Sequence, residues 1–289
     1  KDLDSIDFIK DRFLIETKLG GDPSYNKDFF NTKLYTGNRY REFNFVVRQQ
    51  YDFGKKDSLV TDSTVVKLFY PKLRFEHTFN YGKYSYTYQD QVATGTPTNT
   101  PDSAYYDDNY GIKLPGYQSI SFKDSWKEIS NDFSIYQFPD AKNLRQFIRL
   151  GTQLQLLRGN FFYDSVEKNP SAASLNNIIL HGEYRNRTRN QKWDMVAYGR
   201  LWPAGYNAGD YHAFISLGRL LSSRIGSLQV GFESINRSPS FIYDSRSGFY
   251  FDDPIKNFNK ENTTHLFGVA WLPQLNLRLG ADYYLISNY

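Results

Sequence analysis

The stretch LPQLNLRLGADYYLIS, residues 272–287, contains the pattern that decides the fold. Apolar side chains fall on every second position, at Leu275, Leu277, Leu279, Ala281 and Tyr283. The positions between them are polar or small, at Asn276, Arg278, Gly280 and Asp282. A strand with this period of two lies either on a soluble core or between lipid and water. The rest of the chain has to distinguish these two environments.

Composition narrows the class of protein. The 289 residues suit one large all-β domain or two ordinary ones, and cysteine is absent, which excludes disulfides and thiolate metal sites. The 35 basic and 31 acidic residues are interleaved, without the basic stripe that is typical of nucleic-acid binding. No apolar run approaches the roughly 20 residues of a membrane-spanning helix. The aromatic content of 18% favours strands and membrane interfaces.

The same alternation recurs in other segments of about ten residues, which is typical of membrane barrel strands. The clearest segments are 42–53, 72–81, 143–157, 191–201 and 227–234. The face opposite the apolar one is charged in nearly every segment, whereas a small soluble barrel fills its interior with aliphatic side chains. The pattern therefore predicts a water-filled lumen behind an apolar belt. We expect Leu275, Leu277 and Leu279 to face lipid, with Asn276 and Arg278 inward.

The expected connections alternate between long and short. Long ones are expected near 20–38, 91–116, 159–175, 202–209 and 237–261, and short ones near 54–63, 139–142, 188–191, 222–225 and 273–274. Outer-membrane barrels have long loops outside the cell and short periplasmic turns. The sequence predicts an all-β fold, a single transmembrane antiparallel β-barrel domain over residues 1–289. One segment departs from the pattern: residues 122–133 have helical spacing and predict a short helix or an irregular crossing.

The number of crossings predicts that the sequence is only part of the full barrel. With a first strand at residues 8–19, about eleven crossings are expected, whereas single-chain bacterial barrels have an even number of strands. The last strand, residues 275–289, would then end at the cell exterior. The alternative is that Tyr289 is a true barrel end and that the crossing near Trp126 is miscounted.

Three stretches resemble the outer-membrane porin family of the Bacteroidota. They are SWKEISNDFSIYQF (125–138), NRTRNQKWDMVAYGRLWPAGYNAGDYHAFISL (186–217) and THLFGVAWLPQLNLRLGADYYLISNY (264–289). The turn GYNAGDY (205–211) is the most specific piece, followed by the closing Asn288 and Tyr289. The resemblance covers the second half well and the first half loosely. It implies an outer-membrane β-barrel with porin activity and no catalytic residues, in a family whose chains normally continue past this final strand.

Charged side chains on the expected inner face are the candidate pore wall. They are Arg145, Arg149, Arg185, Arg187, Arg200 and Arg278, opposed by Glu76, Glu183, Asp194, Glu233 and Asp282. Opposed rings of charge act as an electrostatic filter for small hydrophilic solutes. Alternatively, these charges pair with one another and hold a narrow or plugged lumen together. The two functions that follow are passive diffusion through a porin-like channel and a non-conducting barrel subunit of a larger outer-membrane complex.

Metal binding and catalysis find little support in the sequence. His77 and His265 are expected on the outer face, His181 in the lumen and His212 near a strand start, so no pair has ligand spacing. His212 and Ser216 are four residues apart, roughly 13 Å along a strand, which is too far for a nucleophile and its base. No Gly-x-Ser-x-Gly turn occurs. We therefore expect neither an enzyme nor a cofactor.

Carboxylates in the long loops have two interpretations. Asp107 with Asp108, or Asp252 with Asp253, could bind calcium, and solvated loop charge is the alternative. The expected partners are outer-membrane lipid, small hydrophilic solutes, and other outer-membrane proteins or surface lipoproteins, but no nucleic acid. The expected location is the outer membrane of the cell.

Overall fold

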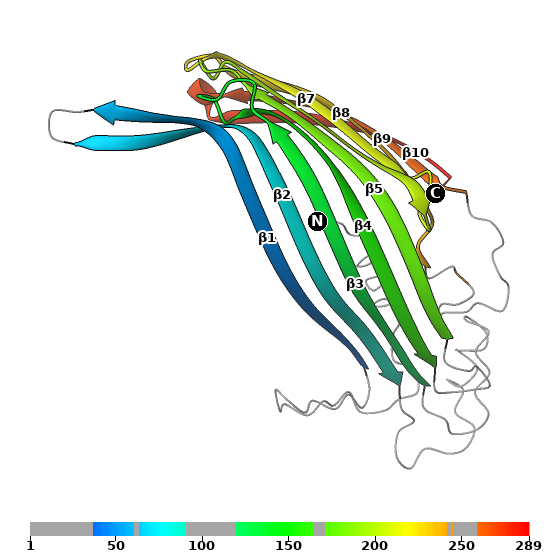
Figure 1. The fold of residues 1–289 in the computed structure, drawn as a ribbon. Coiled ribbons are helices and arrows are strands. Elements are labelled where there is room, and N and C mark those ends of the chain that lie inside the picture. Colours follow the sequence, from blue (N-terminus) through cyan, green and yellow to red (C-terminus); the bar gives the residue numbers. More distant parts are fainter. Residues whose placement is uncertain are drawn as a thin grey trace, which may run out of the picture.

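The computed structural model describes residues 37–60, 64–90, 120–163, 171–241, 244 and 259–288 (Figure 1). Ten strands and one short 3-10 turn, η3 (Pro273–Leu275), form within these residues. The strands are β1 (Gly37–Val60), β2 (Val65–Asp90), β3 (Ile120–Gln137), β4 (Gln146–Tyr163), β5 (Ser171–Arg187), β6 (Trp193–Gly205), β7 (Tyr211–Ser222), β8 (Gly226–Arg237), β9 (Glu261–Leu272) and β10 (Leu277–Ser287). In this part of the chain, no helix has the length and apolar character needed to cross a membrane.

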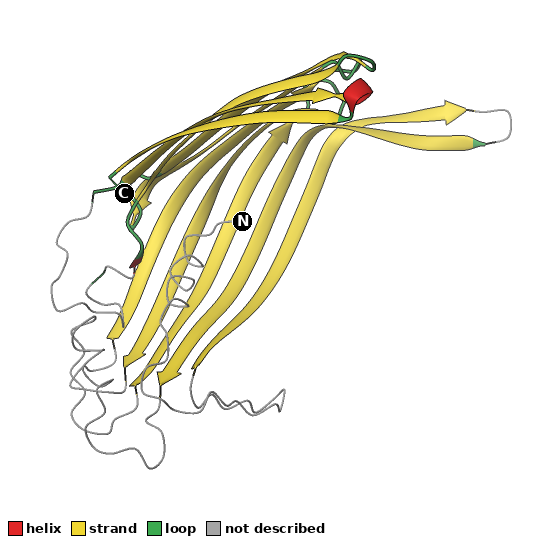
Figure 2. Ribbon diagram, turned by 180° about the vertical axis from the view of Figure 1, so that it is seen from behind, coloured by secondary structure: helices red, strands yellow, loops and turns green. Residues whose placement is uncertain are grey.

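The strands form one antiparallel sheet in which every strand is hydrogen-bonded to its neighbours in sequence. The sheet curves, so that the strands from β6 to β10 bend over those from β1 to β5 (Figures 1 and 2). β1 pairs with β2 at one edge of this sheet, and β10 pairs with β9 at the other. The predicted all-β antiparallel fold is confirmed, as an open curved sheet of the kind found in part of a barrel.

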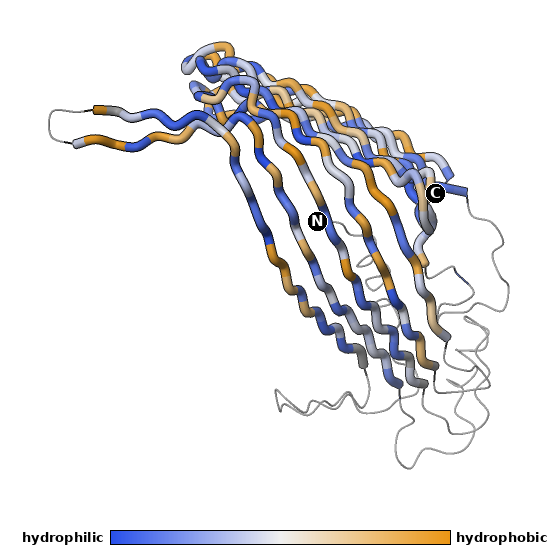
Figure 3. The backbone as a smooth tube through the Cα atoms, in the orientation of Figure 1, coloured by the Kyte–Doolittle hydropathy of each residue, from blue (hydrophilic) through white to orange (hydrophobic). Residues whose placement is uncertain are grey.

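The register of β9 and β10 separates two faces of this sheet. Leu279 lies opposite Ala270 and Tyr283 opposite Leu266, whereas Asp282 lies opposite Phe267 on the other face. We call the face of Leu279 the outer face and that of Asp282 the inner face. The outer-face side chains are uncovered, and Leu279 is 53% exposed. The alternation of apolar and polar residues continues along the strands in Figure 3.

The inner face is the concave one. On it, side chains from strands that are not neighbours reach each other: His181 of β5 bonds Asp132 of β3, and Arg200 of β6 bonds Gln153 of β4. Such contacts skip a strand, and a sheet that curves toward them brings them within reach. The outer face carries large exposed apolar side chains across the sheet, including Leu150, Leu154, Ile215, Val230 and Leu266.

The helix or irregular crossing predicted at residues 122–133 is wrong. These residues belong to β3, which pairs with β2 and β4 along its whole length. Trp126 faces inward opposite Tyr84, and Ile129 and Phe133 are exposed on the outer face. Apolar residues therefore occur on both faces of β3, and their combined spacing imitates a helical period. Hydrogen bonding to two neighbouring strands decides the conformation.

Strands run further than several expected connections allowed. β4 and β5 leave only residues 164–170 between them, β6 continues to Gly205, and the expected turn at 54–63 is largely strand. The connection between β8 and β9, residues 238–260, is close to the range expected. The expected first strand at 8–19, most of the loop at 20–38, the loop at 91–116 and the calcium candidates Asp107, Asp108, Asp252 and Asp253 lie outside the described residues.

The first hairpin leaves the sheet at the end where the connections are short. A register shift between Phe53 and Gly54 marks the point of departure, and beyond it residues 54–60 pair with residues 65–71. Figures 1 and 2 both show this segment turning away from the other strands and extending sideways past them. We call it the β1–β2 arm.

Candidate functional site

A buried carboxylate organises the inner face between β1 and β4. Glu76 of β2 is 6% exposed and accepts a hydrogen bond of 3.1 Å from the Tyr136 hydroxyl. The Arg48 guanidinium of β1 forms an ion pair with it, and Arg149 Nη2 of β4 lies 3.9 Å from its Oε1. A buried carboxylate requires such partners, because an unpaired charge away from water is costly.

The same network continues from Arg149 toward β5. Arg149 donates to Ser134 Oγ from Nε at 3.2 Å and from Nη2 at 3.0 Å, and Ser134 donates to Asp132 Oδ1 at 2.8 Å. His181 Nε2 lies 3.0 Å from the same carboxylate. Gly151 leaves space for this arrangement, since a Cβ there would lie 2.3 Å from His181 Cε1. Two carboxylates and the arginines and histidine that contact them are thus joined across five strands, and we call this set the β1–β5 network.

A second network joins the strands from β6 to β10. Tyr198 and His212 are in contact at 3.1 Å, and His212 Nε2 lies 2.7 Å from Glu233 Oε1. His265 Nδ1 lies 3.3 Å from the other Glu233 oxygen, and its Nε2 lies 2.8 Å from Asp282 Oδ1. We call this set the β6–β10 network. Its imidazoles and carboxylates alternate along a line instead of converging on one point, and the described residues contain no group of three that could hold a metal.

The prediction that His265 lies on the outer face is wrong. His265 pairs in register with Glu233 and Tyr284, and its ring stacks on Tyr284 with centroids 4.1 Å apart on the inner face. Aromatic neighbours suggested lipid, but the inner face is aromatic as well. His77 does share the outer face with Phe133, on which it stacks, and His181 faces inward. His212 has Tyr198 and Glu233 as hydrogen-bond partners.

The segment that follows β8 covers part of the inner face at the end of the sheet opposite the short turns. The Phe241 ring lies 4.9 Å from the ring of Trp126 on β3 and 5.1 Å from that of Phe161 on β4. Ser238, at the base of the segment, donates to Asp210 from its amide at 3.0 Å and its hydroxyl at 2.8 Å. Since β8 is five strands from β3, the segment reaches across the concave side. We call residues 238–241 the crossing segment.

The sequence did not single out this crossing segment. Phe241 stands in a loop with many aromatic and charged residues, and the β3 and β4 rings that it contacts, Trp126 and Phe161, lie 80 or more positions away in the chain. Nothing local marks it as a residue that folds inward. The sequence predicts a connection at 202–209, and the family resemblance points to the Gly205–Tyr211 turn, but neither indicates that this turn receives Ser238. Its Asn207 is held by Asn177, whose Oδ1 accepts the Asn207 amide at 2.9 Å.

The predicted pore-wall residues lie on the inner face with one exception. Arg145 lies in the connection before β4, where its carbonyl accepts the Arg187 amide at 3.3 Å. By register, the inner face holds Arg149, Arg185, Arg187, Arg200, Arg278, Glu76, Glu183, Asp194, Glu233 and Asp282. Some of these form pairs, such as Arg187 with Asp194 at 3.9 Å, whereas Arg200 donates to Gln153 at 2.9 Å.

The predicted pore wall lacks several charged inner-face residues that the two-residue period of the strands could have identified. Arg48 lies in step with Gln50 and Asp52 on β1, and Arg74 of β2 donates to Asp52 at 2.7 and 3.1 Å. Asp132 is likewise in step on β3 with Ser134 and Tyr136. In each of these strands, counting every second residue from one inward-facing position identifies the group that was omitted.

Two short turns are tied together at the arm end of the sheet. Arg189, between β5 and β6, donates to Asp140, between β3 and β4, at 2.7 Å. This guanidinium holds the pKa of the Asp140 carboxyl below its ordinary value. The pair is exposed, so it fixes the position of the turns more than it stabilises the fold.

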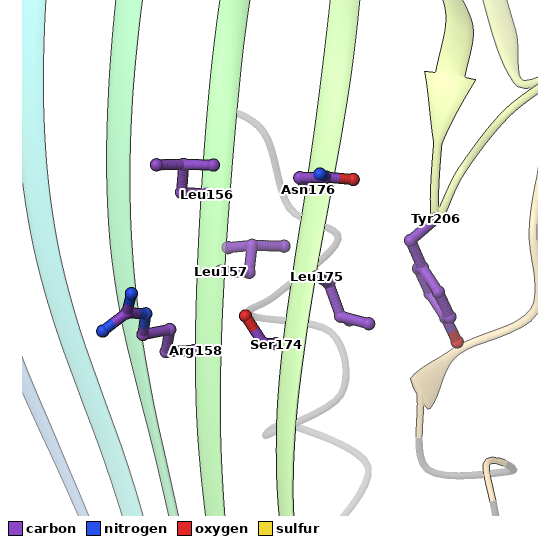
Figure 4. A pocket seen from close by; sticks show the side chains of 7 residues that line it. All are labelled: Leu156, Leu157, Arg158, Ser174, Leu175, Asn176 and Tyr206. Atoms are coloured by element: carbon purple, nitrogen blue, oxygen red, sulfur yellow. The ribbon is translucent and has the colours of Figure 1, made fainter.

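A depression with a cavity volume of about 300 Å³ lies beside β4 and β5 (Figure 4). It is lined by Leu156, Leu157, Arg158, Ser174, Leu175, Asn176 and Tyr206. Tyr206 follows β6, whereas the other six residues come from both faces of β4 and β5, with Arg158 as the one charged member. None of these seven residues belongs to the β1–β5 network or the β6–β10 network.

One of three comparisons with known proteins gives a match. Curated proteins and solved structures give no match to the chain. A family model described as "Putative porin" matches residues 11–289, which is nearly the whole sequence. The predicted resemblance to a porin family is confirmed, and the match points to a channel-type protein and not to an enzyme. With its exposed apolar outer face and its charged concave inner face, the chain belongs to this porin family.

Proposed function

We propose that the chain forms a β-barrel channel of a bacterial outer membrane, through which small hydrophilic solutes diffuse passively. The single observation that carries the proposal is the difference between the two faces of one sheet. Leu150 and Leu154 of β4 are 65% and 44% exposed on one side, while Arg149 takes part in a charged network on the other. Lipid suits the first face and water the second.

The inner-face charges support a filter of fixed geometry. Arg149 is held by Ser134, Glu76 and Asp132, so its guanidinium keeps one position on the wall. Fixed charges on a pore wall discriminate solutes by charge without cofactor or turnover. On this proposal, Arg149, Arg200, Glu233 and Asp282 meet the passing solute, together with the other predicted wall residues that lie on the inner face.

A second candidate function is a non-conducting barrel subunit of a larger outer-membrane complex. The crossing segment favours it, because Phe241 packs on β3 and β4 from the far side of the concave space. The contacts within both networks favour it as well, since polar and charged side chains that bond one another also hold a blocked interior together. Other outer-membrane proteins or surface lipoproteins over the long-loop end would fit this function.

Single-channel recording in planar bilayers separates the two functions. A channel for passive diffusion gives stepwise current that rises linearly with salt concentration. A blocked subunit gives no steps, although the folded chain inserts into the bilayer. Insertion is measured separately by a β-sheet circular dichroism spectrum in vesicles, so that a misfolded preparation is not mistaken for a blocked one.

A further inference from the structure

The β1–β2 arm has no counterpart in the other hairpins of the described sheet. Beyond the register shift at Phe53 and Gly54, its two strands have only each other as hydrogen-bonded neighbours among the strands described. Its base is tightly built, since a Cβ on Gly54 would lie 2.1 Å from the Tyr70 carbonyl oxygen. An isolated two-stranded hairpin is at best marginally stable in water, so a second surface is needed to keep the arm extended.

One face of the arm combines exposed apolar side chains with lysines. In register, Lys56 lies opposite Phe69, Ser58 opposite Lys67 and Val60 opposite Val65. Phe69 is 45% exposed, Val65 63% and Val60 70%, and both lysines are exposed. Lysine stems cover apolar surface while their ammonium groups reach outward, which is the arrangement of side chains at a membrane–water interface.

The short-turn end of the sheet carries the same combination elsewhere. On the outer face Arg219 lies over the Trp193 ring at 4.7 Å, and at the base of the arm Lys142 lies 5.9 Å from the Tyr70 ring. Aromatic rings collect at the depth of lipid headgroups, where basic side chains extend toward phosphate. The arm leaves the sheet near Phe138, whose amide bonds the Lys72 carbonyl at 2.9 Å, at the level where β3 ends.

We propose that the β1–β2 arm lies on the phospholipid leaflet that faces the short turns and binds anionic headgroups through Lys56 and Lys67. This inference rests on the membrane location in the proposed function. Val60, Val65 and Phe69 enter the upper part of the leaflet, and the lysines contact phosphate oxygens. The described residues of the arm have a net positive charge, from Lys55, Lys56 and Lys67 against Asp57. This charge favours an acidic surface as the partner.

Fluorescence from a single site on the arm tests this inference. The chain has no cysteine, so Val65→Cys provides one position for an environment-sensitive fluorophore. The labelled full chain is inserted into vesicles of phosphatidylcholine alone or mixed with phosphatidylglycerol. We expect emission at shorter wavelength and weaker quenching by aqueous iodide when phosphatidylglycerol is present. The double variant Lys56→Gln/Lys67→Gln, in the same labelled chain, should lose most of this difference.

The matched control changes two lysines elsewhere. Lys123 and Lys127 are exposed on the outer face of β3 toward its opposite end, so Lys123→Gln/Lys127→Gln removes the same charge and should leave the fluorescence unchanged. An arm probe that stays in water in both lipids overturns the proposal. Shielding that appears only when other outer-membrane proteins are added also overturns it, in favour of a protein partner.

Conductance of the same labelled chain separates the channel proposal from the proposal that the arm binds lipid. Stepwise current with a water-exposed arm leaves the channel standing and removes lipid binding by the arm. Lipid-dependent shielding without current leaves the arm proposal standing and removes passive diffusion. A β-sheet circular dichroism spectrum of each variant excludes loss of folding as the reason for either result.

Discussion

At the scale of single residues, neighbours in the chain have opposite environments. Leu154 is exposed on the outer face of β4, while Gln153 accepts a hydrogen bond from Arg200 on the inner face. We expect Leu154→Arg to lower the free energy of unfolding in bilayers by about 2–4 kcal/mol, because a lipid-facing charge near mid-membrane is costly. Denaturant unfolding in vesicles measures this. Leu144→Arg, in the exposed connection before β4, should cost little, and equal costs for both would contradict a lipid-facing β4.

If the inner face lines a channel, as we propose, its charges determine the ion preference of that channel. Replacing the inner-face residues Arg149 and Arg278, together with Arg145 in the connection before β4, by Gln should shift the reversal potential in a salt gradient toward cations, since Glu76 and Asp132 then keep their charge without Arg149 beside them. Arg219→Gln on the outer face is the control and should leave the potential unchanged. A conducting triple variant with the wild-type potential would remove these arginines from the filter.

Asp140 predicts an acid-dependent contribution to stability. Its pKa in the folded state is lowered by Arg189, so the folded form is favoured at pH values above the ordinary range of a carboxyl. That contribution is lost as the pH falls through the folded-state pKa. We expect Asp140→Asn to have a slightly lower Tm than the wild type at pH 7 and an equal Tm in strong acid. A difference in Tm that stays constant with pH would contradict this assignment.

At the scale of elements, the turn between β7 and β8 depends on one glycine. Gly226 has φ of 111°, and a Cβ there would lie 1.7 Å from the Trp271 carbonyl oxygen. We expect Gly226→Ala to lower the free energy of unfolding by about 1–3 kcal/mol through backbone strain. Gly218→Ala is the matched control, since its Cβ would have ordinary contact at 3.5 Å from Asp194. Equal stability of the two variants would show that this turn can adjust.

Sequence predicts elements well where one face is uniformly apolar. The end of the chain alternates Leu277, Leu279 and Ala281 with Arg278 and Asp282, and β10 has those faces. The helical prediction for β3 is wrong because its inner face holds Trp126 while its outer face holds Ile129. Apolar character therefore does not distinguish the two faces of this strand. His265 was misplaced for the same reason. The pairing register with neighbouring strands assigns both Trp126 and His265 to the inner face. That register cannot be read from the sequence of one strand alone.

Contacts between distant strands are the part of the candidate site that sequence predicts least. The charged types and their period were visible, so Glu76, Arg149 and Glu233 were placed on the right face. Which of them meet depends on curvature, which brings β4 to β2 and β5 to β3. The crossing segment is the extreme case, since Phe241 and Trp126 are joined only by the shape of the whole sheet.

At the scale of the whole molecule, the crossing segment predicts the size of the conducting path. We expect Phe241→Ala to increase single-channel conductance, because removing the ring takes away its packing on Trp126 and Phe161 and frees the segment from the concave side. Phe162→Ala, an exposed outer-face residue next to Phe161, should leave the conductance unchanged. Equal conductance in both variants would mean that the narrowest point lies elsewhere.

Strand order has a consequence for how such a sheet is assembled and how it changes during evolution. Since each described strand pairs with its immediate predecessor, each new strand closes only the connection to the strand before it and forms its hydrogen bonds on an edge that already exists. Pairing is confined to strands that follow each other in the chain, so folding can proceed as a zipper from either end. Duplication or deletion of one hairpin leaves the pairing of the other hairpins unchanged, so the number of strands in the sheet can change two at a time.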